Sequence, residues 1–118
     1  MSSIKSNISD LPDTTTPLDV LVVAPHPDDA ELGMGGAICK MILQGKKVGI
    51  VDLTDGEPTP YGSPEIRSQE TAAASKALGV TWRFNLGLKN RSLEPTLENR
   101  HRLAGLFRLA RPRWIFAP

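Results

Sequence analysis

Residues 18–31 read LDVLVVAPHPDDAE, and this stretch decides how the rest of the chain is arranged. Its first half is an almost unbroken apolar run, which is typical of a strand buried on both faces. Pro25 and Pro27 end the strand, because proline cannot donate a backbone hydrogen bond to a sheet. A helix is expected to follow, with Asp28 or Asp29 as its N-terminal cap.

The rest of the chain repeats this alternation of strand and helix. The pattern predicts strands over 18–24, 46–54, 80–85 and 114–117, and helices over 30–44, 65–78 and from Pro95 or Thr96 to about 111. Short strands that alternate with helices indicate a mainly parallel sheet. We therefore predict an α/β fold, a Rossmann-like three-layer sandwich, over residues 18–118, preceded by a disordered tail over 1–17.

Three features of the predicted helices bear on packing. The last helix is expected to bury a face made of Leu103, Leu106, Phe107 and Ala110. In the helix over 65–78, four apolar residues are expected to share one face: Ile66, Ala73, Ala77 and Leu78. Three closely spaced glycines in the first helix suggest close packing on the sheet or a backbone that approaches a ligand: Gly33, Gly35 and Gly36.

Composition excludes several classes of function. With 118 residues and a net charge of +1, the chain has no global field that would favour nucleic acid or an anionic membrane. Its one cysteine rules out an internal disulfide framework. No apolar run approaches the roughly 20 residues that span a bilayer, and the N-terminus lacks the apolar core of a secretory signal. We expect a cytoplasmic protein that binds no nucleic acid.

A metal site is indicated where the first strand meets the first helix. His26 stands beside Asp28, Asp29 and Glu31 at the carboxyl edge of the predicted sheet, where α/β folds bind ligands. Imidazole and carboxylate are ligands of catalytic divalent metals, zinc first among them. Without a cation, so many carboxylates would repel one another. One carboxylate could bind metal while its neighbour takes a proton from water, which favours hydrolysis.

Other interpretations of this region stay open. A turn with an Asp helix cap explains part of the pattern. Gly33–Gly36 with Asp52 suggests a dinucleotide-binding module without hydrolase activity, although that motif needs Gly or Ala where Ile38 stands, and the carboxylates would repel a pyrophosphate. A third alternative is a non-catalytic fragment or subunit that docks on another chain through its last strand.

Weaker candidates lie elsewhere in the chain. Asp55, Gly56 and Glu57 follow the second strand at the same sheet edge, where a simple Asp-Gly turn would also explain them. Arg67, near a helix start, either pairs with Glu70 or reaches a polar or anionic substrate. His101, between two arginines, is expected to be a solvated helix residue.

Four blocks of the sequence resemble the PIG-L/LmbE-like zinc-dependent N-deacetylases. They are residues 25–33 with Gly35 and Gly36, then 51–57, 67–70 and 86–88. The details are most similar to the bacillithiol-biosynthesis branch, whose substrate is N-acetylglucosaminyl-malate.

The resemblance implies roles for the candidate residues. His26 and Asp29 would bind Zn²⁺ or another divalent metal, Asp28 would be the general base, and Arg67 would contact the substrate. Glu31, Asp55, Gly56 and Glu57 would support the site. The implied reaction is hydrolysis of the acetamide of a small N-acetylated amino-sugar conjugate. A homo-oligomer is compatible with the exposed last strand that the sequence predicts.

One element of the family pattern is missing from these 118 residues. Family members carry a His-Pro-Asp-His-type block after the fourth strand, which supplies a third zinc ligand and a histidine for the oxyanion. We therefore expect the chain to correspond to the N-terminal part of a single longer domain. Because catalytic zinc normally has three protein ligands, we expect weak activity or none from the 118 residues alone.

Overall fold

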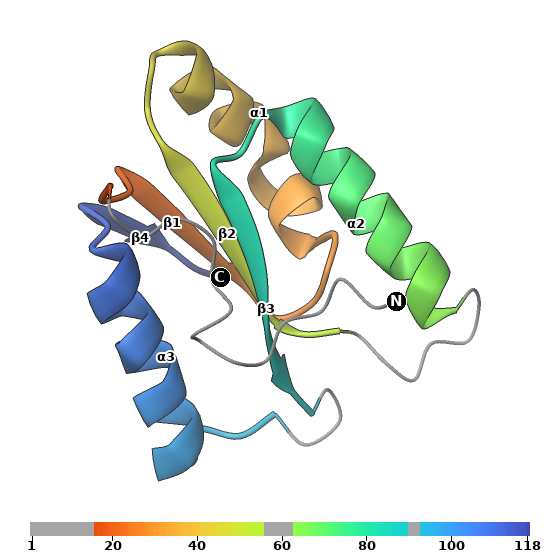
Figure 1. Cartoon of the computed structure of the whole chain (residues 1–118), viewed down its shortest axis with the longest axis vertical. Coiled ribbons are helices and arrows are strands. Elements are labelled where there is room, and N and C mark those ends of the chain that lie inside the picture. Colours follow the sequence, from red (N-terminus) through yellow and green to blue (C-terminus); the bar gives the residue numbers. More distant parts are fainter. Residues whose placement is uncertain (1–15, 56–62, 90–92) are drawn as a thin grey trace.

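The computed structural model describes residues 16–55, 63–89 and 93–118. These form the predicted alternation of strands and helices (Figure 1): β1 (Val20–Ala24), α1 (Asp29–Leu43), β2 (Val48–Thr54), α2 (Pro64–Leu78), β3 (Trp82–Leu88), α3 (Leu97–Ala110) and β4 (Trp114–Phe116). Most of the predicted tail, residues 1–15, lies outside the described residues, as do Gly56 and Glu57.

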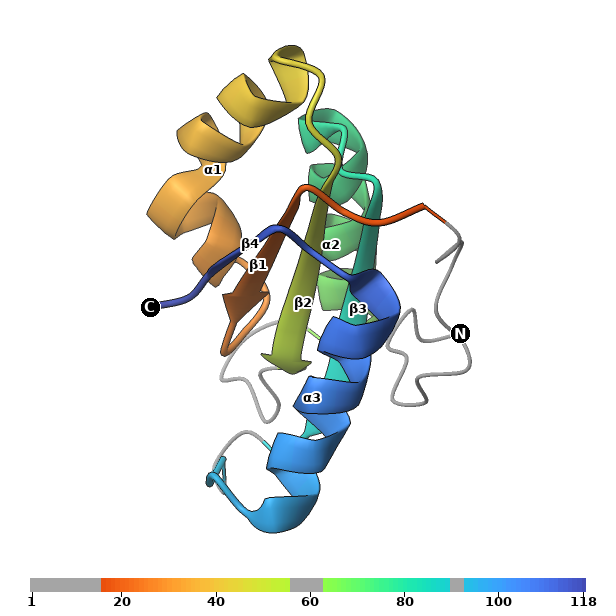
Figure 2. The same ribbon diagram turned by 90° about the vertical axis from the view of Figure 1, so that its left-hand side faces the viewer.

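The four strands form one parallel sheet in the order β3-β2-β1-β4. Helices α1 and α2 cover one face of this sheet and α3 covers the other, as the side view shows (Figure 2). The predicted three-layer α/β fold is therefore confirmed. No helix among the described residues is both long and apolar enough to cross a bilayer.

The central strand β1 explains why the core has two halves. Side chains of successive strand residues point to opposite faces, so Val20 and Val22 pack under α1 while Leu21 and Val23 pack under α3. All five residues of β1 are buried. The unbroken apolar run in the sequence is the direct consequence of this burial on both faces.

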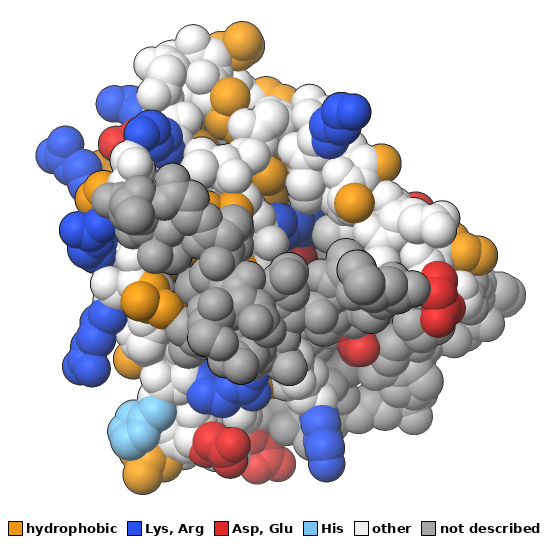
Figure 3. Space-filling model, in the orientation of Figure 1, with side chains coloured by type: hydrophobic (Ala, Val, Ile, Leu, Met, Phe, Trp, Pro, Cys, Tyr) orange, Lys and Arg blue, Asp and Glu red, His pale blue; other side chains and the backbone are white. Residues whose placement is uncertain are grey.

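On the second face, α3 packs as predicted. Leu106 and Ala110 are buried, and Leu103 and Phe107 pack against the same cluster. Its polar end carries basic side chains: Lys and Arg gather along the side of the molecule formed by α3 and β4 (Figure 3). The exposed arginines there include Arg108, Arg111 and Arg113.

The predicted end of the third strand was wrong. We expected this strand to end at residue 85, but β3 runs on to Leu88. Leu86 and Leu88 are buried against the α3 side of the sheet, so burial extends the strand. The pairing with β2 is irregular in this part, shifting register between Asp52 and Thr54, and Gly87 has a positive φ of 76° that glycine adopts without strain.

The apolar residues that were expected to share a face of α2 do not form its inner face. Ile66 is 49% exposed and Ala73 and Ala77 are exposed, although Leu78 does pack inward. The more buried positions of α2 include Ser68 and other small polar residues, Thr71 and Ser75. A charged side chain of β3 lies beneath this helix, which is why its inner face is polar.

The glycines of α1 do not pack on the sheet. A Cβ atom placed on Gly33, Gly35 or Gly36 would meet nothing within 4 Å. The helix is instead interrupted among them, at Met34, with φ −151° and ψ 28°. Because glycine is a poor helix former, the cluster is better explained by this break, which separates the first turn of α1 from the rest of the helix.

Candidate metal and active site

The loop after β1 is held against the end of β2. The last residue of β1, Ala24, pairs in the sheet with Asp52. Beyond this pair, the backbone N–H and the hydroxyl of Thr54 both donate to the carbonyl oxygen of Pro25, at 3.0 and 2.9 Å. Asp55 follows Thr54 directly, so the segment that carries His26 and the segment that carries Asp55 do meet at the carboxyl edge.

His26 and Asp29 form a fixed pair at this edge. The His26 Nδ1 atom lies 3.1 Å from the Asp29 Oδ2 atom. The backbone N–H of His26 donates to the same oxygen at 3.0 Å. The two side chains are 41% and 40% exposed, so solvent and ions can reach them.

The spacing of this pair fits one divalent metal. Two tetrahedral zinc ligands, each about 2.0–2.2 Å from the ion, lie roughly 3.3 Å apart. The observed 3.1 Å between nitrogen and oxygen is close to that value. Within residues 16–55, 63–89 and 93–118, no group of three or more His, Cys, Asp or Glu side chains is arranged to hold a metal. The described chain therefore supplies a pair of suitable donors.

Asp28 has an unusual backbone. It occupies the N-cap position of α1 with a left-handed conformation, φ 81° and ψ −25°, and its side chain makes no capping hydrogen bond. An N-cap Asp normally has an extended backbone and accepts from the helix amides. Left-handed aspartate is uncommon, and such conformations persist only where the surroundings hold them. The exposed Asp28 carboxylate is therefore not explained by helix capping.

Glu31 points into the molecule and binds Arg83. The Arg83 Nη1 and Nη2 atoms donate to the two carboxylate oxygens of Glu31, each at 2.9 Å. The Nε and Nη2 atoms of the same guanidinium donate to Asp52 at 2.7 and 3.0 Å. Arg83 and Asp52 side chains are only 6% and 2% exposed. We call Glu31, Asp52 and Arg83 the arginine clamp.

The pKa values of the two carboxylates in the clamp are shifted in opposite directions. Burial would raise the pKa of Glu31, but hydrogen bonds to Arg83 and its positive charge outweigh burial, so the pKa is lowered. Burial of Asp52 is deeper and raises its pKa despite the hydrogen bonds and charge of Arg83. Although burial lowers the pKa of Arg83, its hydrogen bonds to Asp52 and Glu31 more than reverse this and hold it above its ordinary value.

Burial of Asp52 also bears on the dinucleotide interpretation. That interpretation needs an accessible carboxylate on Asp52 to contact a ribose. The structure has Asp52 1% exposed and paired with Arg83. The observation argues against a nucleotide site built on Gly33–Gly36 and Asp52.

The two remaining candidates lie on helices. Arg67 is near the start of α2, which follows β2, and its Nε atom is buried with no hydrogen-bond partner among the described residues. Leaving a buried donor unpaired costs free energy, so an acceptor on a bound molecule would stabilise it. His101 is exposed on α3, as expected for a solvated residue.

Sequence reasoning missed Arg83 and Asn85. Asn85 is a buried residue of β3, two positions after Arg83. Its side chain donates to the carbonyl oxygen of Thr54 at 2.8 Å and accepts from the backbone N–H of Gly87 at 2.8 Å. A signal for Arg83 was available. Trp82 and Phe84 alternate with it and pack towards α3, so Arg83 had to face α1 and α2, where a cation needs anionic partners.

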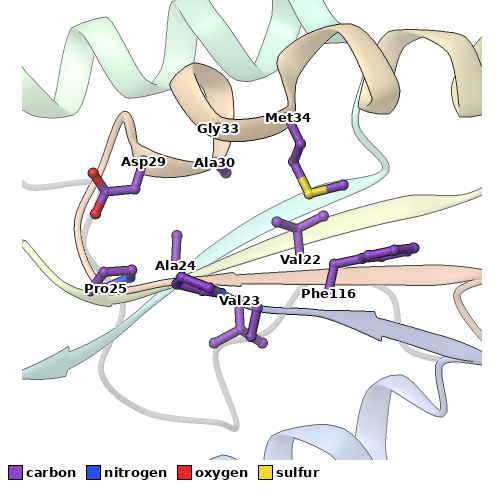
Figure 4. A pocket seen from close by; sticks show the side chains of 11 residues that line it. Val22, Val23, Ala24, Pro25, Asp29, Ala30, Gly33, Met34 and Phe116 are labelled. Atoms are coloured by element: carbon purple, nitrogen blue, oxygen red, sulfur yellow. The ribbon is translucent and has the colours of Figure 1, made fainter.

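An apolar pocket of about 330 Å³ adjoins the pair of His26 and Asp29. It lies between α1 and the strands β1 and β4 (Figure 4). Asp29 and Pro25 lie at one end, and Val22, Met34 and Phe116 lie at the other. Sugar hydroxyls need polar partners, so this lining does not suit a sugar ring.

A known protein family matches most of this sequence. The PIG-L family model, described as GlcNAc-PI de-N-acetylase, matches residues 21–118. The chain belongs to this family. The resemblance inferred from the sequence is thereby confirmed at the level of the family, and the bacillithiol-type branch stays a prediction.

Relatives of this PIG-L chain include deacetylases. It is 31% identical over 106 residues to the diacetylchitobiose deacetylase of Thermococcus kodakarensis, covering 84% of this chain and 40% of the relative. A conserved protein of Thermus thermophilus superposes with a TM-score of 0.82 at 50% identity, over 86% of this chain and 46% of that one. The N,N'-diacetylchitobiose deacetylase of Pyrococcus horikoshii gives a TM-score of 0.78 at 32% identity, over 94% of this chain and 45% of that one.

The match covers only part of each relative. The PIG-L chain spans less than half the length of each of these three proteins. The fold of the matched part is shared with a deacetylase of known structure.

Proposed function

We propose that this PIG-L chain carries part of the active site of a zinc-dependent deacetylase. The substrate would be an N-acetylglucosamine-type conjugate, N-acetylglucosaminyl-malate or a similar molecule, and residues 18–118 would form the N-terminal portion of one deacetylase domain. The observation that carries the proposal is the His26–Asp29 pair, with donor atoms 3.1 Å apart, next to Asp28. Soluble small-molecule chemistry of this kind agrees with the cytoplasmic location expected from the sequence.

Each residue has a distinct role in this proposal. His26 and Asp29 would hold the metal, zinc or another divalent ion. When bound, the metal supplies Lewis acidity, which polarises a carbonyl oxygen and lowers the pKa of a coordinated water. Asp28 would accept a proton from the attacking water, because its carboxylate is exposed and is not used as a helix cap. Asp55, Gly56 and Glu57 would support this edge of the site.

The bond changes are those of amide hydrolysis. The water oxygen bonds to the acetyl carbon and the carbon–nitrogen bond breaks. The proton accepted by Asp28 passes to the departing nitrogen, so acetate and a free amine are released. Arg67 would bind a polar or anionic group of the conjugate, and its buried Nε donor, which has no hydrogen-bond partner in the part of the chain that the structure describes, supports that role.

Zinc titration with a matched histidine pair tests the proposal. We expect His26→Ala to abolish zinc binding measured by calorimetry, and His101→Ala, which removes the other histidine of the chain, to leave it unchanged. Acetate release from N-acetylglucosaminyl-malate in the presence of zinc is expected to be low or undetectable for the 118 residues. Equal zinc affinity in the wild type and the His26 variant would overturn the proposed metal site.

A further inference from the structure

We propose that Arg83 is a positioning residue for the candidate metal site. Through Glu31 and Asp52 it holds the first turn of α1 against the end of β1 and β2, and so sets the placement of Asp28 and Asp29. The inference deepens the proposed function and rests on it for the identity of the site.

The geometry of the clamp suits arginine alone. One planar guanidinium satisfies two carboxylates with four hydrogen bonds between 2.7 and 3.0 Å. Charge-assisted pairs of this bidentate form are strong and directional. Lysine carries a compact charge on a flexible stem and cannot reproduce both forks. The orientation of Glu31 relative to Asp52 is therefore determined by one side chain.

The two carboxylates flank the loop that carries the candidate site. Asp52 lies opposite Ala24, the last residue of β1. Glu31 lies in the first turn of α1, two residues after Asp29. Arg83 thus joins the point where the chain leaves the sheet to the point where it enters the helix. The loop between them contains His26 and Asp28.

Among the described residues, apolar packing holds this first turn only weakly. Ala30 is its buried apolar residue, at 3% exposure, whereas Leu32 is 86% exposed. A Cβ atom on Gly33 would meet nothing within 4 Å, and the break at Met34 separates the turn from the rest of α1. The left-handed conformation of Asp28 persists only if the surroundings hold it, and the clamp adds to the contacts between His26 and Asp29 that do so.

Glu31→Gln is the sharpest variant, because it removes the charge and one of the two acceptor oxygens of the Glu31 arm while Asp52 still pairs with Arg83. Glu98→Gln is the matched control, since Glu98 is an exposed carboxylate in the first turn of α3. We would measure amide hydrogen exchange without metal. The informative amides are those of His26, which donates to Asp29, and Leu32, which donates to the Asp28 carbonyl. We would also measure zinc affinity by calorimetry.

We expect Glu31→Gln to speed exchange at His26 and Leu32 about tenfold, and to weaken zinc binding about tenfold, the lower end of what outer partners of metal ligands contribute. Amides of Val22 and Gln44 should be unaffected, and Glu98→Gln should change neither readout. Arg83→Lys should behave like Glu31→Gln if it folds.

Two results would overturn the positioning role. One is an equal acceleration across α1, α3 and the sheet, which would mean that the clamp only stabilises the fold. The other is unchanged exchange at His26 and Leu32. If the wild type binds no zinc, the proposed function fails, while the exchange pattern still decides whether Arg83 positions the loop.

Discussion

One carboxylate oxygen of Asp29 accepts from the backbone N–H of His26 and lies 3.1 Å from its imidazole Nδ1 atom. The backbone contact fixes the carboxylate, and the carboxylate in turn orients the ring. In the usual arrangement a metal-binding histidine is oriented through the ring nitrogen that does not bind the metal, which donates to a carboxylate or carbonyl. Here the orienting carboxylate is itself a candidate ligand, so both donors are placed together before any ion arrives.

The backbone at Asp28 leads to a first prediction. Glycine adopts φ 81° without strain, so Asp28→Gly should raise the free energy of unfolding by up to about 1 kcal/mol. Asn also tolerates this conformation, so Asp28→Asn should change stability little. Urea unfolding of both variants measures this. Loss of stability in Asp28→Gly would show that the Asp28 side chain makes stabilising contacts.

The clamp predicts a dependence of stability on pH. The pKa of Glu31 is lowered on folding, so its ionised form stabilises the fold at neutral pH, and that contribution is lost as the pH falls through the folded pKa, below its ordinary value of 4.5. Glu31→Gln should therefore be less stable than the wild type at pH 7 and lose less stability on acidification.

Asp52 contributes to stability with the opposite dependence on pH. Its pKa is raised on folding, so its favourable contribution exists when it is protonated and is lost as the pH rises through the raised value. The free energy of unfolding of Asp52→Asn should therefore fall more steeply than that of the wild type as the pH is lowered. The reason is that protonation of Asp52, which offsets the loss of the Glu31 contribution in the wild type, no longer occurs. Urea midpoints between about pH 3 and pH 7 measure both variants. Parallel pH profiles for all three proteins would contradict this assignment.

A pair of glycines tests the packing of the core. A Cβ atom on Gly49 would lie 2.6 Å from the Leu18 side chain and 3.4 Å from Trp82. Gly49→Ala should therefore lower the free energy of unfolding by about 1–3 kcal/mol. Gly36→Ala is the control: its Cβ would meet nothing within 4 Å, and alanine favours helix by about 1 kcal/mol. A destabilised Gly36 variant would mean that α1 needs this glycine.

The outer edge of β4 predicts self-association. Trp114, Ile115 and Phe116 are 65%, 46% and 42% exposed in the last strand of the sheet order. Exposed apolar edge strands pair with other chains, and a lysine on the edge opposes this. Ile115→Lys should shift the protein to smaller species on a sizing column, whereas Leu43→Lys, at an 87% exposed site on α1, should not. Equal elution of the two variants would place the association elsewhere.

The sequence alone determined the alternation of elements, the parallel sheet and the residues around His26. It could do so because strand burial on both faces, helix periodicity and turn residues are local properties of the chain. The end of β3 and the inner face of α2 could not be predicted in this way. Both depend on what packs across them: Leu86 and Leu88 against the α3 side, and the polar residues of α2 over Arg83.

Only the tertiary structure decided which partner each carboxylate has. Residue type alone does not distinguish Asp28, Asp29, Glu31 and Asp52, and the roles that the sequence predicts for them come from a family resemblance. Folding pairs Asp29 with His26, leaves Asp28 exposed in a left-handed turn, and commits Glu31 and Asp52 to Arg83. The reason is physical: a buried guanidinium in β3 requires anionic partners, and only the register of the sheet and the placement of α1 determine which carboxylates can reach it.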